Sequence, residues 1–320
     1  MNQPAPAHPT VGDVGEHAVI REITSAAPSS RNGDDAAVLL PSAPNSRVVA
    51  TTDMLVEGRH FNRAWSTPEE VGIKAVTANF ADIEAMGARP ISALLGLSLP
   101  ADTPLSFVRG LAAGIHEQVQ KYSAELIGGD ITGGSSLVIS VTAIGSLGGN
   151  LPELSLHRAK PGQRLVVHGR LGYSAAGLAL LKRYGRDGVP HRFAELVSAH
   201  CAPQLTPGRG VIARATGATC MTDNSDGLVV DLSTIARRSS VGIDVSAEAI
   251  APDSLLVDAG RELGVDPWQW VLGGGEDHSL LATTVHDAPS GFRTIGRTVR
   301  GSGVTIDGAA PSYNSGWVSF

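Results

Sequence analysis

Aromatic residues, cysteines and long apolar runs are scarce in this sequence of 320 residues. Phe, Trp and Tyr together make up 4% of the chain, so aliphatic side chains must fill its core. No segment reaches the roughly 18 uninterrupted apolar residues that a membrane helix needs. The first residues, MNQPAPAHPT, have neither the basic nor the apolar region of a secretory signal. We therefore expect a cytoplasmic protein with no membrane partner.

The cysteines and the charge balance exclude further classes. Cys201 and Cys220 have no CxxC spacing, which argues against a zinc site and is typical of reduced thiols in the cytoplasm. The net charge is −6 and the chain has no block of Lys and Arg, so we expect no nucleic-acid partner. If such an acidic protein binds phosphates, it must bring cations to hold them.

Several nucleotide and hydrolase motifs are also absent. The chain has no GxxxxGK[ST], no HRD and DFG pair, no GxGxxG after a strand and no GxSxG. These absences argue against P-loop kinases, protein kinases, Rossmann dinucleotide sites and serine hydrolases. GRLGYSAAG (169–177) leads into an expected helix, and two interpretations stay open: an anion site at the helix start, or a turn with packing glycines.

The length and the alternation of apolar runs predict two mixed α/β (α+β) domains. A glycine-rich stretch from 145 to 152 places the boundary, giving domains 1–148 and 149–320. The segment 67–88 predicts a helix, because Thr67 can cap it, Pro68 suits its first position and Gly87 can end it. Other expected helices are 104–121, 174–184, 191–200, 207–216 and 227–238. Expected strands include 47–53, 92–100, 124–130, 137–145, 164–169, 218–223, 241–246, 278–284 and 292–296.

Aspartates stand where many of these elements end. Short carboxylates on rigid element ends can converge on a hard cation such as Mg²⁺, which in turn can bridge to phosphate oxygens. Simpler explanations stay open for some of them: an Asx turn, a helix cap, or a solvated helix face. The acids concerned are Asp34, Asp35, Asp53, Asp82, Asp130, Asp223 and Asp226.

Taken together, the motifs resemble the thiamine-monophosphate kinase family, part of a superfamily that includes aminoimidazole ribonucleotide synthetase, selenophosphate synthetase and a hydrogenase maturation protein. The resemblance covers about residues 33–285. The matching blocks are GDDAAVLL, TTDMLVEGRHF, KAVTANFADIEAMGA, LIGGDITGG, HRAKPGQRLVVHGRLGYSAAGLALL, TDNSDGL and GGGEDHSLL. The sequence departs from the family pattern at Asn224, usually aliphatic, and at His278, usually Tyr; we expect both departures to affect packing more than ligand chemistry.

The resemblance implies a role for each matching residue. The implied magnesium-binding residues are Asp35, Thr51, Thr52, Asp53, Asp82, Asp130, Asp223 and Asp226. The implied ATP-binding residues are Gly129, Asp130, Arg158 and Ser225. The implied substrate-binding residues are His60, Glu276 and Trp317. Among these, Asp130, Asp223 and Arg158 are expected to carry catalysis.

The resemblance also implies a fold and a reaction. The expected fold is a two-domain synthetase-like one, whose N-terminal mixed sheets form a barrel in a homodimer and whose C-terminal α/β domain completes the cleft. The expected reaction is direct in-line transfer of phosphate from ATP to thiamine monophosphate with several Mg²⁺ ions, the final step in making thiamine diphosphate. Two alternatives stay open: another ATP-using member of the superfamily, and a non-catalytic nucleotide- or metal-binding regulator.

Overall fold

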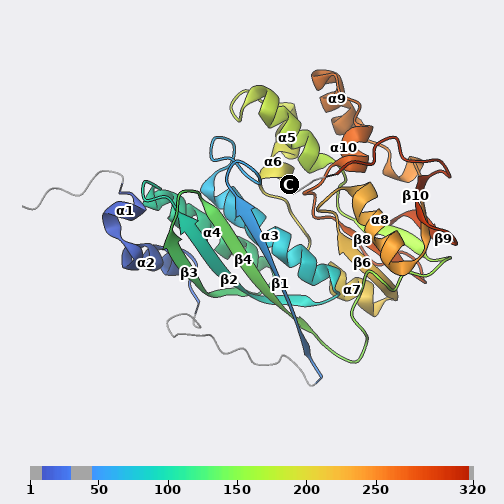
Figure 1. Cartoon of the computed structure of the whole chain (residues 1–320), viewed down its shortest axis with the longest axis horizontal. Helices are drawn as coiled ribbons and strands as arrows, with labels where there is room; N and C mark the ends of the chain where they lie inside the picture. The colour runs from blue at the N-terminus through green and yellow to red at the C-terminus, as the bar shows by residue number, and fades with distance from the viewer. Residues whose placement is uncertain (1–8, 30–44, 317–320) are drawn as a thin grey trace, which may run out of the picture.

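The computed structural model describes residues 9–29 and 45–316 (Figure 1). It contains two β-sheets with helices packed on them, so the predicted mixed α/β class is confirmed. Within the described ranges, no helix has both the length and the apolar character needed to cross a bilayer.

The first sheet has four strands in the order β1-β4-β2-β3, and helices α3 and α4 cover one of its faces (Figure 1). Strands β1 and β4 pair antiparallel, and β2 and β3 pair parallel. The strands are β1 (Arg47–Val56), β2 (Arg89–Leu99), β3 (Glu125–Gly133) and β4 (Val138–Leu147). The helices are α1 (Val11–Val14), α2 (Glu16–Ala26), α3 (Pro68–Ala85) and α4 (Leu105–Lys121).

Helix α3 starts as the sequence predicts. Thr67 and Glu70 form a capping box, and Pro68 occupies the first turn. Fourteen of the 18 residues of this helix are buried, although several of them are polar. The helix is buried on nearly every side because the first sheet lies against one side and the second half of the chain against another. Thr77 Oγ1, for example, donates to the carbonyl of Pro203.

The second sheet has six strands in the order β10-β7-β9-β5-β8-β6. They are β5 (Arg164–His168), β6 (Ala218–Asp223), β7 (Gly242–Val245), β8 (Leu280–Thr284), β9 (Arg293–Val299) and β10 (Gly303–Ile306). The α-helices are α5 (Tyr173–Tyr184), α6 (Ala194–Cys201), α7 (Arg209–Ala215), α8 (Leu228–Ser239), α9 (Ser254–Leu263) and α10 (Trp268–Gly273). Short 3-10 turns cover His191–Phe193 and Glu248–Ile250. The sequence did not predict α9, α10 or β10.

Each half has its own apolar core, and contacts across α3 join the two. One core fills the space between the first sheet and its helices, and another lies around β5, α5 and α8. A smaller cluster packs Ala81 and Ala85 of α3 against Met221 of β6. Arg186 adds a two-pronged ion pair to Glu70, at 2.7 and 3.0 Å. The second half therefore lies directly against the polar residues of α3.

Candidate functional site

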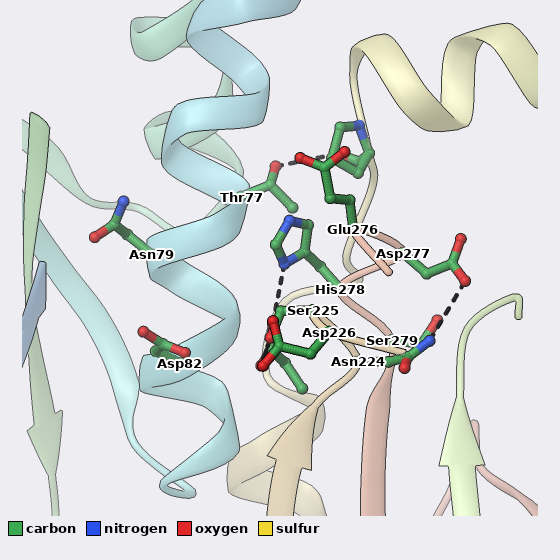
Figure 2. Close-up of polar contacts among 12 residues, drawn as sticks. Thr77, Asn79, Asp82, Asn224, Ser225, Asp226, Glu276, Asp277, His278 and Ser279 are labelled. Atoms are coloured by element: carbon green, nitrogen blue, oxygen red, sulfur yellow. Dashed lines mark hydrogen bonds and ion pairs between the residues drawn. The ribbon is translucent and has the colours of Figure 1, made fainter. Parts of the chain in front are cut away.

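A group of carboxylates lies where α3 meets the second half of the chain. Asp53 comes from β1 and Asp82 from α3, while Asp223 ends β6 and Asp226 follows it. Asp82 accepts a hydrogen bond of 2.7 Å from Thr51 Oγ1. Figure 2 shows Asp82 projecting from α3 and Asp226 from the neighbouring loop. Simpler explanations were open for two of the four, and the structure supports neither of them. Asp82 is partly buried, so it does not lie on a solvated helix face. Gly227, and not Asp226, is the N-cap of α8.

Hydrogen bonds between two loops set the geometry of this group. The loop after β6 and the loop before β8 continue the pairing of their strands. The N–H of Asn224 donates to Ser279 O (2.7 Å), that of His278 to Asn224 O (3.1 Å) and that of Glu276 to Ser225 O (2.8 Å). This pairing places Ser225, a predicted ATP-binding residue, beside the predicted substrate residue Glu276, and it places Asp223 against His278.

The carboxylates repel one another. Burial, followed by the charge of Asp223, raises the pKa of Asp53, of Asp226 and of Asp82, the last to about 7. A cation among them would relieve this repulsion, and all the side-chain donors are oxygens, which suit Mg²⁺. Within residues 9–29 and 45–316, no three His, Cys, Asp or Glu side chains form a metal cage by themselves.

Asp231 is a further carboxylate of this group, and it was not predicted from the sequence. It lies in the first turn of α8 and accepts hydrogen bonds from the N–H groups of Asp226 and Gly227 at 3.2 and 3.1 Å. Burial and the charges of Asp223 and Asp226 raise the pKa of Asp231 to about 8. Its place in the first turn of an expected helix is a signal that could have identified it.

The segment from Glu276 to His278 has unusual backbone geometry. Glu276 and His278 both have positive φ, at 61° and 50°, a conformation that non-glycine residues rarely adopt. Between them, Asp277 accepts hydrogen bonds from the N–H groups of Gly172 and Ser174, at 2.5 and 2.8 Å. The sequence left the start of α5 open as an anion site, and in the structure this helix start binds the carboxyl group of Asp277. Burial raises the pKa of Asp277 to about 7 despite these bonds.

Glu276 lies against two basic side chains. Its carboxylate is 3.2 Å from Lys74 Nζ on α3 and 3.6 Å from His200 Nδ1 on α6. Burial alone would raise the pKa of Glu276, but the charges of Lys74 and of the neighbouring histidines, together with the hydrogen bond from Lys74, outweigh it and lower that pKa. Burial and the same lysine lower the pKa of His200 to about 3, so this imidazole is neutral. Lys74 also donates to the carbonyl of His60 at 2.8 Å.

Two predicted ligands lie on the other face of the first sheet. Thr52 bonds to Thr142 and Ser140 of β4 on the face that α3 and α4 leave uncovered. Asp130 pairs with Gly96, whose neighbours Leu95 and Leu97 are buried, so alternation places Asp130 on that same uncovered face. The register of β1, β4, β2 and β3 separates Asp53 from Asp130 by three strand spacings, about 14 Å.

The other predicted ATP and substrate residues are placed as follows. Gly129 precedes Asp130 on β3, and a Cβ there would lie 2.0 Å from Leu95 O, so the close approach of the strands requires glycine. Arg158, in the segment between β4 and β5, donates to Glu153 O at 3.4 Å. Asp35 and Trp317, and also Asp34, lie outside the described residues.

The two departures from the family pattern lie inside the site. Asn224 is fully buried, and its amide is 3.4 Å from Asp277 Oδ2, while its own Oδ1 has no partner among residues 9–29 and 45–316. His278 bonds through Nδ1 to Asp223 Oδ2 at 2.9 Å, and this bond together with the charges of Asp223 and Glu276 outweighs burial and raises the pKa of His278. His278 thus contacts a predicted metal ligand directly, and the expectation that both departures affect packing more than ligand chemistry stays a prediction.

Comparisons with known proteins agree with this fold. Residues 33–147 match the model of the AIR synthase related protein N-terminal domain. Thiamine-monophosphate kinase of Corynebacterium glutamicum is 63% identical, over 98% of this chain and 95% of the relative. That of Mycobacterium tuberculosis is 45% identical, over 98% and 93%. The solved structure "AaThiL complexed with AMPPCP and TMP" has a TM-score of 0.79 at 32% identity, over 96% and 97%. Thiamine-monophosphate kinase from Stenotrophomonas maltophilia has a TM-score of 0.81 at 32% identity, over 92% and 98%.

The two-sheet fold and its N-terminal match define an AIR synthase-related protein with a carboxylate-lined site. Within that group, the relatives that match over nearly the whole chain decide the family. The chain belongs to the thiamine-monophosphate kinase family, and it is a kinase.

Proposed function

We propose that the protein transfers the terminal phosphate of ATP to thiamine monophosphate and so produces thiamine diphosphate. The observation that carries the proposal is the carboxylate group around Asp223, whose loop pairs with the loop of Glu276, in a chain whose relatives are named for this reaction. Residues 1–148 would hold ATP and metal, and residues 149–320 would complete the cleft.

The acidic residues of the site are proposed to hold several Mg²⁺ ions. Thr51, Asp53, Asp82, Asp223 and Asp226 all offer oxygen donors, and their mutual repulsion favours a bound cation. When bound, Mg²⁺ supplies positive charge that offsets the charge of the phosphates.

The chain's own residues would position the two substrates. The acceptor phosphate is already anionic near neutral pH, so the reaction needs no general base and we propose direct in-line transfer. Ser225, Gly129 and Arg158 would contact ATP, with Arg158 offsetting phosphate charge. His60 and Glu276 would hold the thiamine portion. Trp317 would lie against the cationic thiazolium, a cation–π contact of about 1–2 kcal/mol where desolvated.

A homodimer would explain why Asp130 and Thr52 lie on the uncovered face of the first sheet. Val48 and Met54 are exposed apolar residues on this face, at 77% and 56%. Strands β1 and β3 are the two edges of the sheet, so a barrel made from two copies can pair β3 of one copy with β1 of the other. In that arrangement, Asp130 would approach β1 of the partner, which carries Thr52 on the same face of the sheet and Asp53 on the other.

ADP release measured with thiamine monophosphate and with unphosphorylated thiamine tests the reaction. We expect ADP with the monophosphate alone. Binding of ATP and Mg²⁺ without ADP release from any phosphorylated acceptor would instead favour the regulator alternative. A phosphorylated enzyme that passes its label to thiamine monophosphate would refute direct transfer.

A complementation experiment tests the dimer. Asp130→Asn and Asp223→Asn should each be inactive alone, whereas mixed dimers should regain activity, because one site then has both carboxylates intact. Inactive mixed dimers would place both carboxylates in one copy. A monomer by light scattering would refute the dimer itself.

A further inference from the structure

Lys74 is a buried cation at the centre of the site that the resemblance does not explain. It lies in the middle of α3, is 1% exposed and ranks among the largest fully buried side chains in the described part of the chain. Lysine is almost never buried without a partner, because removing an ammonium group from water is costly. Its contacts should therefore indicate its role.

The contacts of Lys74 join the two segments that carry predicted substrate residues. Nζ donates to the backbone carbonyl of His60 at 2.8 Å and lies 3.2 Å from Glu276 Oε1. His60 belongs to the loop between β1 and α3, and Glu276 to the loop before β8. In Figure 2 Glu276 lies beside α3, close to Thr77. One ammonium group thus links the first half of the chain to the second.

The two linked segments differ in how they are held in place. Glu276 has a φ of 61°, which costs free energy for a non-glycine residue. Its second oxygen is 3.6 Å from the neutral His200, whose Nδ1 is 3.1 Å from Ser174 Oγ. In the other segment, the N–H of Val56 donates to His60 Nδ1 at 3.0 Å, which fixes the ring. Because Lys74 contacts both segments, its removal would take away the direct link between them.

We infer that Lys74 is a positioning residue for the acceptor substrate: it holds Glu276 and the His60 loop at a fixed separation that admits the thiamine portion. The inference rests on the proposed function. A buried ion pair contributes little net stability compared with well-packed apolar side chains, so stability alone gives no reason for a lysine here. A fixed carboxylate facing a cationic ring does give one, because it spares the substrate the cost of ordering the pocket.

The chain offers a matched control for a general link between the halves. Arg186 also bridges them, through its ion pair with Glu70 and a 2.9 Å hydrogen bond to Trp65 O. Neither Arg186 nor Glu70 belongs to the proposed substrate or metal residues. Arg186→Met therefore removes a cation that links the halves without disturbing the pocket.

The test compares Lys74→Met, Arg186→Met and the wild type. We expect Lys74→Met to raise the KM and Kd for thiamine monophosphate about ten-fold or more, with the KM for ATP within about two-fold. Arg186→Met should leave both KM values nearly unchanged while lowering the unfolding midpoint. Circular dichroism and calorimetric titration report fold and binding directly. Should Lys74→Met fail to fold, Lys74→Gln, which keeps donors but not charge, takes its place.

The outcomes separate this inference from the proposed function. If the wild type releases no ADP with thiamine monophosphate, the proposed function fails first. If the wild type is active and both variants change the KM for thiamine monophosphate alike, Lys74 is a structural link and the inference is overturned. An equal rise in the KM for ATP after Lys74→Met would overturn it as well.

Discussion

Replacing Asp82 by Asn should stabilise the protein in the absence of metal. The pKa of Asp82 rises from 3.8 to about 7, chiefly because of burial and the charge of Asp223. Each unit corresponds to about 1.4 kcal/mol, so keeping this carboxylate ionised costs at most about 4 kcal/mol at neutral pH. Asn has nearly the same shape, and its Oδ1 can accept the bond from Thr51. Because neighbouring carboxylates share the repulsion, we expect the substitution to raise the free energy of unfolding by about 1–3 kcal/mol.

The gain should depend on pH with a defined sign. A carboxyl whose pKa is raised on folding binds its proton more tightly in the folded state, so its contribution falls as pH rises from about 4 to about 7. The advantage of Asp82→Asn over the wild type should thus be small near pH 4 and largest above pH 7. Urea unfolding in EDTA at pH 5 and pH 7.5 measures the difference.

The exposed Asp187 provides the matched control. Asp187→Asn removes one charge from the surface, and its free energy of unfolding should match the wild type within about 0.5 kcal/mol at both pH values. An Asp82→Asn variant that is less stable than the wild type at pH 7.5 in EDTA would refute the electrostatic reasoning. A stability advantage of equal size at pH 5 and pH 7.5 would contradict it too.

Three other outcomes are expected. Asp223→Asn should lower turnover about 100-fold or more without unfolding the chain; near-normal rates at saturating Mg²⁺ would make this acid structural. Gly177→Ala places a Cβ 2.0 Å from Leu196 O between α5 and α6 and should cost about 1–3 kcal/mol in urea unfolding, whereas Gly133→Ala, with open space around it, should cost less. Cys201 and Cys220 are buried, and burial raises the pKa of Cys220 to about 12, so a thiol reagent should label both only after unfolding.

The elements with strong local signals could be predicted from the sequence. Helix α3 is correct in start and extent, because Thr67 and Pro68 act locally. Strand β10 was missed because it pairs in parallel with β7, some 60 residues away, and only the folded chain joins them. Helix α9 was missed although Asp253 caps its start and Gly264 its end, a pair of local signals that its sequence does contain.

The residues of the site also divide into those that the sequence could predict and those that it could not. Asp82 and Asp223 were identified by position and resemblance, and the structure places them together. Lys74 could not be identified, since a lysine in an apolar helix gives no local sign of its partners on distant loops. The face of the sheet on which Asp130 lies could not be predicted either, because a register shift between β2 and β3 breaks the simple alternation of the strand.

The burial of α3 limits how this protein can change during evolution. Fourteen of its 18 positions touch packed neighbours, so a new side chain there disturbs both halves at once. Substitutions in the loop before β8 can consequently change the substrate preference at a lower cost in stability than substitutions in the helix. Among related enzymes, new substrates should then correlate with that loop, while the helix retains its length and its spacing of small and polar residues.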